Sequence, residues 1–168
     1  MIEDFLKGRA LKLDRMISSK DIVPGDYTES YHQKIEIIPM QKVYPDFIEE
    51  VFTKNILVGT ENFGFGSSKE ISATWLRKSG VKVIIAKTFF MPFYKNAFNI
   101  GLLCLEANTD YISHGDELYI DLKQMFIRNK NKLLGIKFQT IPKYFFKLYT
   151  NGGLLKSMKE EKRNDKRY

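Results

Sequence analysis

One segment near the middle of the chain constrains the fold more than any other. Two short apolar runs, at residues 56–59 and 81–86, flank an amphipathic stretch at residues 68–79 that stops at Gly80. Parallel strands need a connection of a dozen or more residues, and buried parallel strands read as short apolar runs. The segment therefore predicts a βαβ unit, with Gly80 ending the helix.

The same alternation of strand and helix patterns continues on both sides of this unit. Further strands are expected at residues 9–13, 102–105, 117–121 and 133–139, and further helices at residues 45–52, 92–99 and 142–149. This order predicts an α/β domain with a mixed sheet, parallel around the βαβ unit and antiparallel late in the chain. The length of 168 residues fits one domain. We assign residues 1–155 to it and expect residues 156–168 to form a charged, solvated tail that frays.

Charge and cysteine content limit the possible partners. The net charge is +7, but its basic residues are not strongly clustered outside the tail, so nucleic acid is not expected as a partner and is kept only as a weak alternative. Cys104 is the only cysteine, so the chain cannot form an internal disulfide or ligate an iron–sulfur cluster by itself. The acidic start and the lack of a long apolar run argue against a signal peptide or a membrane span, so a cytoplasmic location is expected.

Other conspicuous side chains are assigned structural roles. His32 and His114 do not have the spacing of metal ligands, so both are expected to be surface or locally hydrogen-bonded residues, and no metal site is assigned. The aromatic run at residues 89–98 has the i to i+4 spacing of a packed helix face rather than of a base-stacking surface. Cys104 is expected to be buried, and Lys95 to be exposed.

The residues with chemical potential gather in the loop of residues 59–70, between the first strand and the helix of the βαβ unit. Gly64 and Gly66 allow positive φ angles, and Ser67 followed by Glu70 has the spacing of a capping box, which predicts that the helix begins at Ser67. Free N–H groups and the helix dipole would then favour a carboxylate or phosphate there. The loop would present Gly66, Ser67, Ser68 and Lys69.

This loop is not one of the common phosphate-binding motifs. A P-loop needs a lysine before its serine or threonine, whereas Lys69 follows the two serines. Lys69 also occupies the position of the third glycine of a dinucleotide fingerprint. Taken alone, the loop could be no more than a glycine turn before a well-capped helix.

Longer blocks of sequence resemble one family. They are ENFGFGSSKE at residues 61–70, GVKVIIAKTF at residues 80–89 and FYKNAFNIGL at residues 93–102, with SKDIVP at residues 19–24 and GGL at residues 152–154. In this order they resemble the small subunit of isopropylmalate isomerase, also called 3-isopropylmalate dehydratase. That family is similar to the homoaconitase small subunit and to the swivelling C-terminal domain of aconitase.

The resemblance implies both a fold and a reaction. The fold is a swivelling β/β/α domain that covers a [4Fe–4S] cluster held by a separate large subunit, in a heterodimer or heterotetramer; this chain itself would bind no cofactor. The reaction isomerises a small hydroxy acid by removing water and adding it back at the neighbouring carbon. By position, Ser67 matches the catalytic base, Ser68 and Lys69 match residues that bind substrate carboxylates, and Gly66 and Lys20 belong to the same substrate-binding set.

Several positions depart from the family pattern. Lys69 stands where arginine is usual. A guanidinium group can bind a carboxylate through two hydrogen bonds, whereas the lysine ammonium group is a compact point charge. Lys20 replaces an aspartate that supports an active-site histidine in aconitase-like enzymes, and a cation there would depress the basicity of that histidine. Asp21 could supply the missing carboxylate only if this segment were shifted by one residue along the chain. Ser18, Phe65 and Ile71 also differ from the usual residues, and Phe65 could narrow the pocket.

Two further hypotheses remain beside leucine-pathway isopropylmalate isomerisation. The segment of residues 25–30 is polar where an apolar substrate contact is usual, which suggests a different hydroxy acid, as in homoaconitase. Alternatively, the chain is a divergent paralogue that keeps the fold and the subunit interface but acts as a non-catalytic or regulatory partner. The replacement at Lys20 is the main argument for this second hypothesis.

Overall fold

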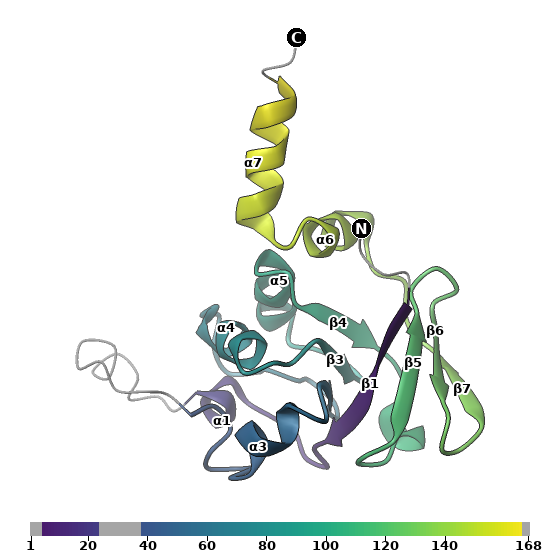
Figure 1. Cartoon of the computed structure of the whole chain (residues 1–168). Coiled ribbons are helices and arrows are strands. Elements are labelled where there is room, and N and C mark those ends of the chain that lie inside the picture. Colours follow the sequence, from purple (N-terminus) through teal and green to yellow (C-terminus); the bar gives the residue numbers. More distant parts are fainter. Residues whose placement is uncertain (1–4, 24–37, 166–168) are drawn as a thin grey trace.

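Strand β1 (Phe5–Lys12) lies in the middle of a seven-stranded sheet and joins its two halves. The computed structural model describes residues 5–23 and 38–165, and the strand order is β4-β3-β2-β1-β5-β6-β7 (Figure 1). On one side β1 runs parallel to β2, with Ala10 opposite Ile56. On the other side it runs antiparallel to β5, with Gly8 opposite Leu118. The predicted α/β domain with a mixed sheet is confirmed.

The parallel half contains the predicted βαβ unit. Strands β2 (Ile56–Val58), β3 (Val83–Ala86) and β4 (Leu103–Glu106) pair in parallel. Helices α4 (Ile71–Lys78) and α5 (Met91–Asn99) connect them and pack against each other (Figure 1). Every residue of β2 and β3 is buried, as expected for parallel strands covered on both faces.

The antiparallel half is a meander of β5 (Glu117–Asp121), β6 (Phe126–Asn129) and β7 (Leu134–Lys137). Along β5, the buried Leu118 and Ile120 alternate with partly exposed residues, so one face of this half packs on the core. The strands expected at residues 117–121 and 133–139 are present in outline. Strand β6 was not expected from the sequence.

The remaining helices are short or lie beside the sheet. Helices α1 (Ser19–Ile22) and α3 (Phe47–Val51) and the 3-10 turn η1 (Thr109–Tyr111) lie in the connections. Helix α6 (Lys143–Thr150) packs on α5, where the ring centroid of Phe145 lies 5.3 Å from those of both Tyr94 and Phe98. The aromatic run at residues 89–98 therefore belongs to the core, and its expected packing role is confirmed.

Helix α7 (Leu154–Asp165) projects away from the sheet and its covering helices (Figure 1). Its first turn follows a bend in which the Gly153 N–H donates to the Leu148 carbonyl at 2.8 Å. Farther along, Glu161 accepts a hydrogen bond from Lys147 of α6 at 2.7 Å. Residues 156–165 of the expected charged tail thus lie in this helix, which is tied to α6. The division of the chain at residue 155, which falls inside this helix, stays a prediction.

No helix in the described part of the chain is both long and apolar enough to span a membrane.

Candidate functional site

The loop of residues 59–70 follows the carboxyl end of β2 and is held from two sides. Ligands of open α/β sheets bind beyond the carboxyl ends of the strands, so this is where a site is expected. On one side, the Gly64 N–H donates to the Ile17 carbonyl at 2.8 Å, and the Ser19 N–H donates to the Phe65 carbonyl at 2.7 Å. The loop is thus bonded to the segment that links β1 to α1.

On its other side the loop is bonded to the connection between β3 and α5. The Phe63 N–H donates to the Thr88 carbonyl, and the Phe90 N–H donates to the Phe63 carbonyl, both at 3.0 Å. Gly64 has a φ of 82°, and a Cβ at this position would overlap the ring of Phe93. Only glycine fits there without strain, so the loop has one well-defined course.

The predicted site residues come together at the end of this loop. The Ser67 hydroxyl oxygen accepts a hydrogen bond from the Lys69 N–H at 3.2 Å, and the Ser68 carbonyl accepts one from Asn96 Nδ2 at 2.8 Å. Ser67 is partly exposed, whereas Ser68 and Lys69 are exposed. Gly66 has a φ of 94° with open space on its Cβ side. A hydroxyl, a cation and an open backbone surface therefore lie side by side, a combination that can receive a carboxylate.

The predicted start of the helix at Ser67 is wrong. Helix α4 begins at Ile71, and Glu70 is its N-cap residue without a side-chain cap. The Ser67 hydroxyl accepts the N–H two residues later, in a local turn that precedes the helix. In addition, the Ser68 carbonyl accepts a hydrogen bond from Asn96, which lies on α5.

Lys20 lies in α1, on the segment that borders this loop. The Ser19 hydroxyl donates to the Gly64 carbonyl at 2.6 Å, and the Ser72 hydroxyl donates to the Ser19 carbonyl at 3.2 Å. Ser19, the residue before Lys20, is therefore hydrogen-bonded to both the loop and α4. Lys20 itself is exposed, and within the described part of the chain its ammonium group has no ion-pair partner.

Asp21 is bonded within its own segment, and its taking over from the aspartate missing at position 20 stays a prediction. It closes a capping box on α1, in which its carboxylate accepts hydrogen bonds from the Ser18 N–H at 2.8 Å and the Ser18 hydroxyl at 2.7 Å. The same carboxylate lies 3.6 Å from Arg15. Asp21 thus has a structural role, and Ser18 serves as the N-cap of this short helix.

Residues 24–37 lie outside the described residues. They include the expected specificity segment at residues 25–30 as well as His32. The role of this segment in choosing the hydroxy acid therefore stays a prediction.

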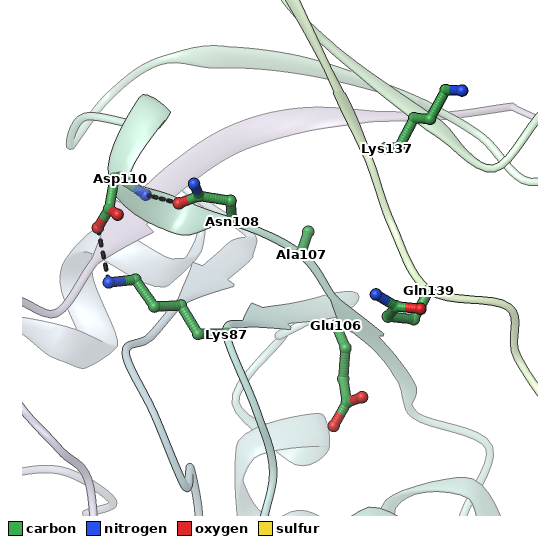
Figure 2. Close-up of a pocket in the computed structure, with 7 residues that line it drawn as sticks. All are labelled: Lys87, Glu106, Ala107, Asn108, Asp110, Lys137 and Gln139. Atoms are coloured by element: carbon green, nitrogen blue, oxygen red, sulfur yellow. Dashed lines mark hydrogen bonds and ion pairs between the residues drawn. The ribbon is translucent and has the colours of Figure 1, made fainter.

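A polar cavity of about 420 Å³ lies near the loop, at the carboxyl ends of β3 and β4. Seven residues line it, as Figure 2 shows: Lys87, Glu106, Ala107, Asn108, Asp110, Lys137 and Gln139. Sequence reasoning missed these residues. The available signal was their position, because Lys87 directly follows β3 and Glu106 ends β4.

Lys87 links this cavity to the loop. Its Nζ lies 2.7 Å from Asp110 Oδ1 and 3.2 Å from Oε1 of Glu61, which belongs to the loop (Figure 2 draws the first pair). Hydrogen bonds to Asp110 and then to Glu61 raise the pKa of Lys87. The pKa of Glu61 is lowered by its own backbone N–H and then by Lys87. Because these groups are open to water, they add little stability, and their effect is to fix the charges beside the loop.

Metal-ligating side chains do not converge in the described part of the chain. There, no group of three histidine, cysteine, aspartate or glutamate residues is placed to hold a metal ion. Cys104 is fully buried, as predicted, and burial raises the pKa of its thiol well above the usual range. His114 makes the expected local contacts, since its Nε2 lies 3.1 Å from Glu50 Oε2 and its Nδ1 accepts the Lys12 N–H at 3.4 Å.

Comparisons of the sequence and of the fold with known proteins all find relatives of the aconitase C-terminal domain. Residues 13–110 match the family described as the aconitase C-terminal domain. The chain is 37% identical over 155 residues to 3-isopropylmalate dehydratase small subunit 2 of Archaeoglobus fulgidus, covering 91% of this chain and 94% of that protein. It is 36% identical over 162 residues to the methanogen homoaconitase small subunit of Methanocaldococcus jannaschii, covering 94% and 93%. The crystal structure of a 3-isopropylmalate dehydratase from Methanocaldococcus jannaschii superposes with a TM-score of 0.87 at 33% identity, covering 97% of this chain and 98% of that one.

Proposed function

Because the chain belongs to the aconitase C-terminal domain family, we propose that it is the small subunit of a two-subunit hydro-lyase. Its partner is a large subunit that holds an iron–sulfur cluster, and the pair interconverts 2- and 3-isopropylmalate by dehydration and rehydration. The names of relatives that align over nearly their whole length support this assignment. A cytoplasmic location and a heterodimer or heterotetramer remain part of the proposal.

The arrangement of Ser67, Ser68 and Lys69 carries the proposal. Ser67 is the group that takes a proton from the carbon next to a substrate carboxylate. A serine hydroxyl is a weak base unless its oxyanion is stabilised, and the Lys69 N–H already donates to this oxygen at 3.2 Å. The exposed Lys69 ammonium and Ser68 then bind the carboxylate that becomes more negative as the proton leaves.

The cluster belongs on the partner and not on this chain. The only cysteine, Cys104, is buried and its thiol is held in the neutral form, which does not fit a cluster ligand. A cluster on the large subunit would supply a Lewis acid for the substrate hydroxyl. The residues of this chain contribute proton transfer and carboxylate binding.

A second candidate function is a divergent paralogue that uses another hydroxy acid or that has lost catalysis. It is favoured by Lys20, which stands where the resemblance leads us to expect an aspartate, while the neighbouring Asp21 closes the capping box of α1. A relative named as a homoaconitase small subunit supports another hydroxy acid as the substrate.

Anaerobic reconstitution with each iron–sulfur large subunit of the same genome tests the proposal. Complex formation is measured by size exclusion, and hydration of isopropylmaleate and of homologous unsaturated di- and tricarboxylates is followed by absorbance. Turnover that disappears in Ser67→Ala but persists in Ser113→Ala, an exposed serine outside the site, supports the enzyme. A tight but inactive complex that Lys20→Asp with Lys69→Arg restores would favour the paralogue. Failure to form any complex would refute the two-subunit assignment.

A further inference from the structure

Asn96 stands out among the polar residues near the loop because its side chain reaches across from another helix. It lies on α5, and its Nδ2 donates to the Ser68 carbonyl at 2.8 Å. On either side of it along α5, Phe93 and Phe98 are almost fully buried in the aromatic core. Asn96 is therefore presented from a rigid support.

The bond from Asn96 ends on the same peptide group that contacts Ser67. The Ser68 carbonyl and the Lys69 N–H belong to one planar trans peptide, so fixing the oxygen also fixes the direction of the hydrogen. That hydrogen is donated to the Ser67 hydroxyl oxygen at 3.2 Å. Asn96, the peptide and Ser67 thus form hydrogen bonds in series, and such chains strengthen one another by polarisation.

The sequence itself favours a competing arrangement of these residues. Ser67 and Glu70 have the spacing of a capping box, in which Ser67 would accept the Glu70 N–H and the helix would begin early. The observed helix begins at Ile71 instead. In the observed arrangement, residues 67–69 lie outside the helix, Asn96 donates to the Ser68 carbonyl, and the Lys69 N–H donates to Ser67.

We propose that Asn96 is a positioning residue for catalysis, which holds the Ser68–Lys69 peptide so that its N–H stabilises the Ser67 oxyanion. This role rests on the proposed function of Ser67 as a base. Asn96 need not touch the substrate. Its effect passes through the peptide, so it should change the rate of proton transfer more than substrate binding.

The kinetic test compares Asn96→Asp with Asn99→Asp in the reconstituted pair. Asn99 is a matched control, because it has the same amide, lies on the same helix one turn later, and makes no side-chain hydrogen bond within the described residues. The aspartate at position 96 keeps the size of the side chain but turns a donor into an acceptor facing the Ser68 carbonyl. We expect kcat to fall at least tenfold with KM changed less than twofold, while the control stays within twofold of wild type.

The pH profile separates positioning from a general loss of structure. Loss of an N–H donor to the oxyanion raises the pKa of the Ser67 hydroxyl, so the rising limb of kcat should move to higher pH in Asn96→Asp. A merely structural role would lower kcat without moving this limb, and that result, or an unchanged kcat in an active pair, would overturn the proposal while leaving the proposed function intact.

A second readout does not depend on activity. The amide proton of Lys69 is followed by NMR in the isolated full chain, in wild type, Ser67→Ala and Asn96→Asp. Both variants should move this resonance upfield, because each weakens the bond that the Lys69 N–H donates. An unmoved resonance in Asn96→Asp overturns the positioning role even if every large subunit gives an inactive pair, a result that would count against the proposed function alone.

Discussion

Replacing Gly64 by alanine should destabilise the chain by about 2–5 kcal/mol, and the same change at Gly66 by only about 1–2 kcal/mol. Both glycines have positive φ angles, of 82° and 94°, so the backbone cost for an L-residue is shared. They differ in what a new methyl group would meet. At Gly66 nothing lies within 4 Å, whereas at Gly64 the methyl group would overlap the ring of Phe93.

The extra cost at Gly64 depends on whether the Phe93 ring can move. It is 1% exposed, its centroid lies 5.4 Å from that of Phe63, and it stacks on Phe89 at 6.4 Å. Rings confined on several sides cannot make room cheaply, and overpacking of this kind costs about 1–3 kcal/mol. That amount is the expected difference between Gly64→Ala and Gly66→Ala.

Urea unfolding followed by circular dichroism measures this difference directly, with calorimetry as a second method. For a chain of this size, each kcal/mol corresponds to a shift in Tm of about 2–4 °C. Equal losses in the two variants would show that the Phe93 ring yields, and the argument that close packing fixes the course of the loop would fail.

Three further perturbations test other parts of the structure. Ser18→Ala should cost about 0.5–2 kcal/mol in urea unfolding, because α1 loses its N-cap, while the exposed Ser113→Ala should cost almost nothing. Gly153→Ala should lower Tm and loosen α7 in hydrogen exchange, because a Cβ there would lie 2.6 Å from a backbone carbonyl; an unchanged Tm would contradict this close approach. Lys87→Met should lower the urea midpoint slightly at pH 7. Since the pKa of Glu61 is lowered from 4.5 in the fold, the stabilisation by this pair is present above about pH 4.5 and lost as the pH falls through the lower folded value; a difference from wild type that does not shrink as the pH is lowered would contradict it.

The parallel half of the sheet could be predicted from the sequence because its signals are local. Residues 56–58 and 83–86 are apolar at every position and are followed by glycine or helix patterns, which is what burial on both faces requires. Strand β6 (Phe126–Asn129) escaped prediction, since four residues that include an arginine and an asparagine carry too little alternation to detect. Helix α7 escaped because its residues are mostly charged and depend on contacts with α6.

The sequence motif at residues 59–70 located the candidate site, but it did not predict the geometry of that site. The spacing of Ser67 and Glu70 gave a clear capping signal, yet the helix begins at Ile71, and the Ser68 carbonyl is bonded to Asn96, which lies 28 residues away in the chain. The placement of Lys20 likewise depends on hydrogen bonds between residues 19 and 64, a separation of 45 positions. Local propensity cannot report such contacts, because tertiary partners override it.

The central position of β1 has a consequence for how the chain is made. Phe5–Lys12 are synthesised before their antiparallel partner, Glu117–Asp121, which follows more than half of this chain's length later. At about 5–20 residues per second, this leaves one edge of β1 without its partner for on the order of ten seconds. During that time the parallel half can assemble on β1 alone, with an open strand edge that other chains could pair with. Slow or interrupted translation between residues 12 and 117 should therefore promote aggregation of this protein more than a pause after residue 121.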